Sequence, residues 1–278
     1  MADICHNHLF TICSQTVLIL SSAFYIYHME LKHIDIERLQ ADLSAIKEQF
    51  NGAKPFRYVC FDNFFENEKA QLIHEAYPVV DPGTWNGITY VNQKNKFQKT
   101  EFEAGSTLSS AFEELNSSTF LSWLQDLTDF PEKIEADTQL FGGGLHQSVN
   151  GAFLNVHVDY NIHPETKYHR RLNVIVYMNQ DWKDSYEGHL ELWNLTNGKK
   201  EQIARIAPQF NRCVIFETNE ISFHGHPKPL NTPEGVNRKS LATYYYTKTR
   251  PQSEQVNSHN TIYVNTEGVG GKVKQFNS

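Results

Sequence analysis

The sequence predicts a mixed α/β, mainly β protein. Its second half is expected to form a β-sandwich or jelly roll, with helices of the first half against one sheet. From about Thr138 onward, short runs of β-forming residues alternate with turn residues. Before Thr138, strand-like and helix-like segments are mixed. The chain has 278 residues, 40% of them hydrophobic, which is enough for one substantial core.

The elements of the first half are short. The run FRYVCF at 56–61 predicts a strand, and a helix is expected over 67–77, where Pro78 ends it. Two amphipathic helices are expected within 107–126. Apolar residues at helical spacing follow Met29, so a folded domain could begin there.

The strands of the second half are predicted from alternation of apolar and polar residues. In the run RLNVIVYM, one face is aliphatic and the other carries Asn173, Ile175 and Tyr177. The predicted strands are TQLFG, FLNVHV, RLNVIVYM, GHLELW, RCVIFE, ISFHGH and SLATYYYTK. Closely spaced strands of this kind are typical of sandwiches that hold a pocket between two sheets.

The segment Leu9–Tyr27 is an uncharged run of 19 residues, long enough for a membrane span or a signal region. No basic residue precedes it, and it contains several Ser, Thr and Gln residues. Two interpretations remain. Residues 1–28 are either an upstream extension or a membrane anchor, and membrane contact is expected only in the second case.

Charge and cysteine content exclude some classes of function. The net charge is -7 and no basic block is present, so nucleic acid is not expected as a partner. Four scattered cysteines do not form a disulfide framework, which indicates reduced thiols and a cytoplasmic location.

One pattern of side chains points to metal chemistry. In the strand ending at HVD, alternation places His157 and Asp159 on the same side. A third ligand, either His224 or His226 of a later strand, would complete a facial triad suited to octahedral iron. Further along, Arg238 and Ser240 share one face, and a guanidinium next to a hydroxyl suits a carboxylate ligand.

In these motifs the chain resembles the iron(II)/2-oxoglutarate-dependent oxygenase superfamily, in its prolyl-4-hydroxylase-like branch, over about 138–247. The phrase VIVYMNQDWKDSYEGHLELWN at 174–194 is similar to that branch's Tyr-Leu-Asn, Asp-Trp and Gly-Gly-x-Leu elements. Met178 replaces the Leu, and His189 replaces the second Gly. In the first half, the similarity is limited to FRYVCFDNFFENEKAQLI.

The resemblance implies a double-stranded β-helix and a role for each motif residue. Iron(II) would be held by His157, Asp159 and His224, because the family's element is Ser-x-His and here that is Ser222-Phe223-His224. His226 is therefore expected to be a supporting or structural residue. The distal carboxylate of 2-oxoglutarate would be bound by Arg238, helped by Tyr177 and Ser240. No catalytic residue is expected beyond the metal centre.

The implied activity is hydroxylation of a C–H bond with 2-oxoglutarate and O2, and ascorbate is a further candidate cofactor. Asp159 fills the metal position that halogenating relatives leave open, so halogenation is not expected. Substrate would be held by loops at Gly142–Gly151 and Asn161–Arg171, with Arg170 as a contact; a solvated loop is the alternative for the second.

Several alternatives remain for function. The substrate is a prolyl residue in a peptide, a free amino acid or a biosynthetic small molecule, and the rival function is a catalytically silent jelly-roll binding or regulatory protein. The expected organisation is an extension or anchor at 1–28 and one oxygenase domain at 29–278. Within that domain, support is expected at 29–137, the β-helix core at 138–250 and a tail at 251–278.

Overall fold

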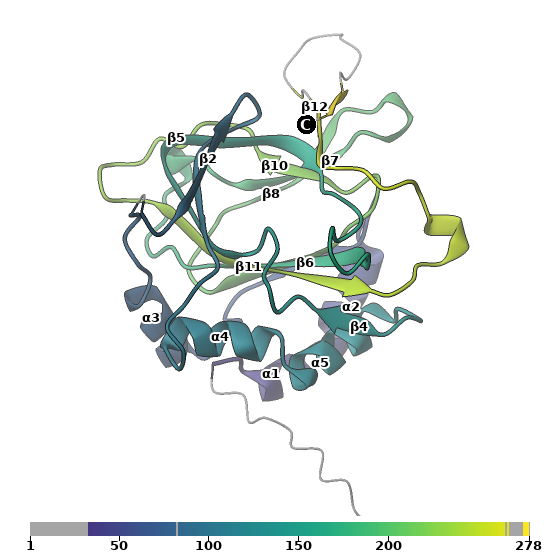
Figure 1. The fold of residues 1–278 in the computed structure, drawn as a ribbon, viewed down its shortest axis with the longest axis horizontal. Helices are drawn as coiled ribbons and strands as arrows, with labels where there is room; N and C mark the ends of the chain where they lie inside the picture. The colour runs from purple at the N-terminus through teal and green to yellow at the C-terminus, as the bar shows by residue number, and fades with distance from the viewer. Residues whose placement is uncertain (1–32, 82, 265, 267–274, 278) are drawn as a thin grey trace, which may run out of the picture.

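Antiparallel strands dominate the architecture (Figure 1). The structure is a computed structural model that describes residues 33–81, 83–264, 266 and 275–277. In these described residues, 13 strands belong to one hydrogen-bonded sheet that curls into two facing layers. The predicted mainly β jelly roll is confirmed.

The long strand β5, Gly144–Val158, is shared by both layers. On one edge its residues pair with β3 (Gln93–Lys99) and then β12 (Ile262–Val264). On the other edge they pair with β11 (Arg238–Thr247) and then β10 (Phe223–His226). Residues facing inward from β5 are therefore flanked by four other strands.

The remaining strands extend these layers. The first layer continues from β11 through β6 (His169–Tyr177), β9 (Arg212–Glu217) and β1 (Tyr58–Phe61). The second layer continues from β10 through β7 (Leu190–Asn194) and β8 (Glu201–Ile206). Smaller strands are β2 (Asn86–Tyr90), β4 (Ile134–Ala136) and β13 (Gln275–Asn277).

Five α-helices lie below the first layer in Figure 1, as expected for helices of the first half. Among the described residues, these are α1 (Ile36–Ala41), α2 (Leu43–Gly52), α3 (Asn67–Glu75), α4 (Thr107–Leu115) and α5 (Ser118–Thr128). Short 3-10 helices occur at Asp184–Tyr186, Thr196–Gly198 and Gln252–Glu254. The apolar face predicted for β6 packs in the same core as the helices: Leu172, Val174, Val176 and Met178. The opposite face of β6 is thus left for the pocket.

The expectations for residues 138–151 are wrong in two respects. TQLFG is not a strand but a pair of turns, since Leu140 and Gly142 have φ values of 53° and 73°, which an extended strand does not adopt. The predicted substrate loop at Gly142–Gly151 is mostly strand, because β5 begins at Gly144. The hairpin of β2 and β3 was not expected, and it covers this part of β5.

Some expectations fall outside the described residues. These are the extension or anchor at 1–28 and the thiols of Cys5 and Cys13. Cys60 and Cys213 are described, and both are free thiols. No helix in the described part of the chain is both long and apolar enough to span a bilayer.

Candidate metal centre

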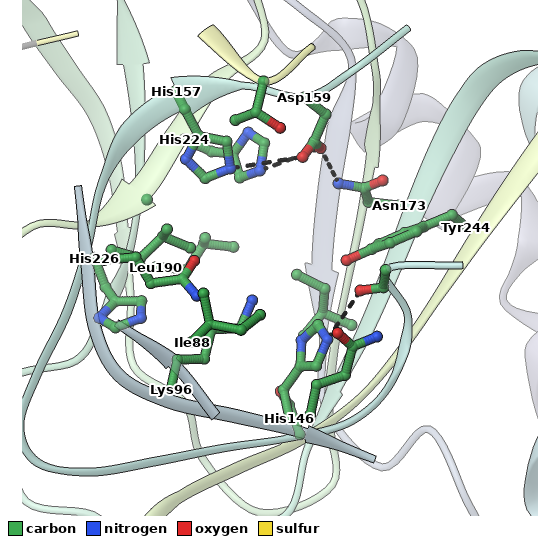
Figure 2. A pocket seen from close by; sticks show the side chains of 18 of the residues that line it. Ile88, Lys96, His146, His157, Asp159, Asn173, Leu190, His224, His226 and Tyr244 are labelled. Atoms are coloured by element: carbon green, nitrogen blue, oxygen red, sulfur yellow. Dashed lines mark hydrogen bonds and ion pairs between the residues drawn. The ribbon is translucent and has the colours of Figure 1, made fainter. Parts of the chain in front are cut away.

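Strand pairing brings the two predicted histidine ligands together. His157 of β5 and His224 of β10 are directly opposite each other in the antiparallel ladder, so their side chains share one face. Their ring centroids are 4.4 Å apart. Asp159 follows the end of β5, and one ligand atom from each of the three residues lies within 4.8 Å of the others (Figure 2).

Backbone carbonyls fix the orientation of both rings. His157 Nδ1 donates to the carbonyl of Asn155 and His224 Nδ1 to that of Ser222, each at 2.8 Å. Because a carbonyl can only accept, Nδ1 carries the proton in the neutral form of each ring, and that form leaves a lone pair on Nε2. These Nε2 atoms lie 3.6 and 3.5 Å from the carboxylate oxygens of Asp159.

The three donors fit a ferrous ion. Neighbouring ligands on an octahedral ion with bonds of about 2.1 Å are about 3 Å apart, close to the observed separations. Two imidazoles and one carboxylate on one side of an ion are the facial arrangement typical of non-haem iron. Burial, and then the nearby His157, lower the pKa of His224 to about 3, so the ring is in the neutral form that binds metal.

Asp159 is held as an anion by its neighbours. Its Oδ2 accepts from Asn173 Nδ2 at 2.8 Å and lies 3.0 Å from the guanidinium of Arg170. Burial alone would raise the pKa of Asp159, but the charge of Arg170 keeps it well below its usual range. Arg170 was expected to contact the substrate, and it does line the pocket. Its polar atoms, however, bind Asp159 and Asn173. Its guanidinium also stacks on Tyr244, with its central carbon 3.5 Å from the ring centroid.

A bulge explains why Arg170 reaches the site. Leu172 pairs with Tyr245, but Arg170 pairs with Tyr246, so Arg171 is an extra residue in β6. Without that extra residue, alternation from Asn173 would turn Arg170 away from the pocket. The alternative of a solvated loop at 161–171 is wrong at four positions, since Asn161, His163, Arg170 and Arg171 are buried.

Arg238 lies in the same pocket with part of its guanidinium already fixed. Its Nε donates to the carbonyl of Gly188 at 2.7 Å, and a terminal nitrogen donates to Tyr177 Oη at 3.1 Å. Ser240 also lines the pocket. Gly188 has φ 70°, and a Cβ there would lie 2.3 Å from Leu230, so glycine is needed for its carbonyl to meet Arg238. His189, at the expected second glycine, instead approaches Asp184.

The pocket has a volume of about 220 Å³. It contains residues that sequence reasoning missed, mainly from β3 and β5: Lys96, Gln93, Gln98, His146, Asn173 and Tyr244. Asn173 could have been found, because it shares with Tyr177 the face predicted opposite the aliphatic one. The residues of β3 could not, since its run QKNKFQK has no apolar alternation.

Residues 143–246 match a family model described as the 2OG-Fe(II) oxygenase superfamily. The matched region includes His157, Asp159, His224 and Arg238. No curated protein sequence matches the chain.

Solved prolyl hydroxylases have a similar fold. One from Trichoplax adhaerens, in complex with a hypoxia inducible factor oxygen degradation domain peptide fragment, has a TM-score of 0.54 and 17% identity, covering 76% of this chain and 93% of that one. A Pseudomonas putida prolyl-4-hydroxylase has a TM-score of 0.51 and 15% identity, covering 74% and 99%. A Phytophthora capsici prolyl 4-hydroxylase has a TM-score of 0.54 and 17% identity, covering 84% and 72%. At these identities the likeness establishes the fold.

Proposed function

We propose, on the premise that residues 143–246 form a domain of the 2OG-Fe(II) oxygenase superfamily, that this protein is an iron(II)- and 2-oxoglutarate-dependent hydroxylase. The observation that carries the proposal is the convergence of His157, Asp159 and His224 in the pocket that also contains Arg238. The binding of 2-oxoglutarate and ferrous ion rests on these four side chains.

Each of the four residues would have a distinct task. His157, Asp159 and His224 would hold the ion by one side, leaving three positions of an octahedron for 2-oxoglutarate and O2. When bound, the ion would supply the oxidation in which 2-oxoglutarate becomes succinate and CO2, one oxygen atom entering succinate and the other the substrate C–H bond. Arg238 would hold the distal carboxylate, with Tyr177 Oη and Ser240 beside it.

The neighbours of Asp159 support hydroxylation. Arg170 and Asn173 keep its carboxylate charged and oriented, so this residue would occupy its metal position throughout the reaction. A halide would need that position to be vacant. We therefore assign hydroxylation rather than halogenation to the site.

We propose two candidate classes of substrate. The three structures compared above are prolyl hydroxylases, and one holds a peptide fragment, which supports a prolyl or amino-acid-like substrate. A biosynthetic small molecule is the second candidate, supported by the modest volume of about 220 Å³. For the location we propose the cytoplasm, and the free thiols of Cys60 and Cys213 support this.

Turnover of 2-oxoglutarate tests the proposal. The full chain is incubated with Fe(II), ascorbate, O2 and 2-oxoglutarate, and succinate is measured alongside a mass-spectrometric screen for substrates that gain one oxygen atom. We expect iron-dependent succinate in the wild-type protein and none with Asp159→Ala. Equal succinate in both proteins would contradict the metal assignment. Tight binding of 2-oxoglutarate without any succinate would indicate the silent binding protein instead.

A further inference from the structure

Three polar side chains face the pocket without a partner in the described part of the chain. Gln93 and His226 are each 4% exposed, and the buried Gln93 Nε2 and His226 Nδ1 atoms have no hydrogen-bond partner. The ammonium of Lys96 makes no hydrogen bond or ion pair with any described residue. Unpaired polar atoms as buried as those of Gln93 and His226 are costly unless a ligand satisfies them.

The register of the sheet gathers these donors beside the metal centre. Gln93 of β3 and His226 of β10 both pair with Leu154 of β5, one on each edge. The side chains of Gln93, Leu154 and His226 therefore share a face. All three line the pocket. A second set of three paired residues lies across β3, β5 and a neighbouring strand in the same way.

In this second set, Lys96 of β3 and Arg238 of β11 both pair with Ser148 of β5. Their backbones are therefore two strand spacings apart, roughly 10 Å, and both side chains line the pocket. Figure 2 shows Lys96 and His226 on the same side of the pocket, below the metal ligands. Arg238 and Lys96 therefore approach the pocket from different strands, so each can contact a different anionic group.

The charges of the pocket are unbalanced. Among the described residues that line it, Lys96, Arg170 and Arg238 are cationic and Asp159 is the one carboxylate. A ferrous ion and a doubly negative 2-oxoglutarate cancel each other, so an excess of two positive charges remains after both have bound. Locally, Asp159 neutralises Arg170 and the distal carboxylate of the cosubstrate would neutralise Arg238, so the excess would lie on the ferrous ion and on Lys96. Lys96 is left without a counter-ion.

We propose that Lys96, with Gln93 and His226, binds a carboxylate of the substrate to be hydroxylated. The substrate is thus a small carboxylic acid, or a residue with a free carboxylate, rather than a neutral residue inside a peptide. The inference rests on the proposed function, because that function accounts for both carboxylates of 2-oxoglutarate. Burial, together with the charge of Arg238, lowers the pKa of Lys96 to about 8, and an anion bound at this place would raise that pKa again.

Paired acids and amides test the proposal directly. The probes are acetate, benzoate, L-proline and N-acetyl-L-proline, each beside its primary amide, at millimolar concentration. They are added to the full chain loaded with Mn(II) and 2-oxoglutarate, and binding is measured by ligand-observed NMR and thermal shift. We expect acids to bind better than their amides and Lys96→Met to weaken the acids ~10–100-fold, the effect of losing a charge-assisted hydrogen bond. Acids that bind no better than amides would overturn the proposal.

Two lysine variants control this experiment. Lys94→Met removes an exposed lysine from the same strand and is expected to leave acid binding unchanged. Lys96→Arg keeps the positive charge and is expected to restore acid binding in part. If Lys94→Met weakens the acids as much as Lys96→Met does, the effect is a general change of charge and the proposed contact is wrong.

The affinity for 2-oxoglutarate shows whether Lys96 binds a carboxylate of the substrate or a carboxylate of the cosubstrate. Lys96→Met is expected to change the dissociation constant of 2-oxoglutarate by less than about threefold, whereas Arg238→Met should raise it ~10–100-fold. Equal losses in both variants would assign Lys96 to the cosubstrate and overturn the proposal. Absence of 2-oxoglutarate binding in the wild-type protein would instead contradict the proposed function, and the acid–amide comparison would still report on Lys96.

Discussion

Arg238 is oriented before any ligand arrives, because Gly188 and Tyr177 hold two of its nitrogen atoms. A preoriented guanidinium loses little freedom when it binds a carboxylate. Arg238→Ala is therefore expected to weaken 2-oxoglutarate binding ~10–100-fold, and Tyr177→Phe ~3–10-fold, since a neutral hydrogen bond contributes less. Isothermal titration calorimetry of the Mn(II)-loaded protein measures both.

The control for this prediction is Arg205→Ala. Arg205 lies on β8, outside the pocket, and pairs with Asp184 and Glu187. Its loss should leave 2-oxoglutarate binding unchanged. A comparable loss in Arg205→Ala and Arg238→Ala would show that the carboxylate responds to overall charge and not to one guanidinium.

Asp159 is the ligand whose loss should be most damaging. Asp159→Ala removes the carboxylate that both Nε2 atoms face and leaves Arg170 as an uncompensated cation in the same pocket. We expect metal affinity to fall by more than ~100-fold, as measured by Mn(II) binding in electron paramagnetic resonance. Asp137→Asn, which neutralises a buried carboxylate bound to backbone N–H groups, is the matched control and should retain the metal.

At the scale of elements, Gly225 determines how closely β10 lies against β5. A Cβ at this position would lie 2.8 Å from the carbonyl oxygens of Leu154 and Asn155. Gly225→Ala should therefore push the strands apart, separate His224 from His157 and destabilise the fold by about 1–3 kcal/mol. Urea unfolding and Mn(II) titration should both register the change.

Gly52→Ala is the matched control, because no atom lies within 4 Å of a Cβ placed there. This change at the end of α2 should leave metal affinity unaltered and stability equal or slightly higher. Unchanged metal affinity in Gly225→Ala would mean that the contact between β10 and β5 does not position the ligands.

Strands with strong alternation of apolar and polar residues could be predicted from the sequence. The bulge in β6 and the strand β3 could not, for different reasons. β6 was predicted with both faces assigned, and its aliphatic face does pack on the core. The bulge at Arg171 was not, because alternation assumes a regular ladder and a bulge depends on the neighbouring strand. β3 was missed because its pairing with β5, and not its own composition, makes it a strand.

The residues of the candidate site also divide into those that the sequence predicted and those that it did not. His157, Asp159, His224 and Arg238 lie in short motifs, and the sequence alone indicated that they belong together. Lys96 and Gln93 have no motif, since only the register of β3 against β5 turns them toward the pocket. Long-range pairing of this kind leaves no trace in local sequence.

At the scale of the whole molecule, buried histidines make stability depend on pH. Three pocket histidines have lowered pKa values, in each case first because of burial: His146, His224 and His226. In the unfolded chain their pKa is about 6.5, so below that pH the unfolded state binds more protons than the folded state. Their contribution is therefore fully present above about pH 6.5 and is lost as the pH falls toward the folded values, about 3 for His224.

We expect the metal-free protein to lose stability between about pH 6.5 and 5, with a slope of up to ~1.4 kcal/mol per pH unit for each of the three histidines. Urea unfolding at a series of pH values measures this slope. His224→Gln should flatten it by the share of one histidine. A free energy of unfolding that stays constant or rises across this range would contradict the burial of neutral imidazoles.

Because β5 joins both layers, the distance between His157 and His224 depends on complete closure of the barrel. Segments far apart in the chain must dock before the ion meets all of its ligands, and such contacts form late in folding. Metal retention is thus a sensitive assay of structural integrity. Substitutions far from the pocket that weaken the pairing of β10 with β5 should first cause loss of the metal ion. Unfolding should follow only when the fold is destabilised further.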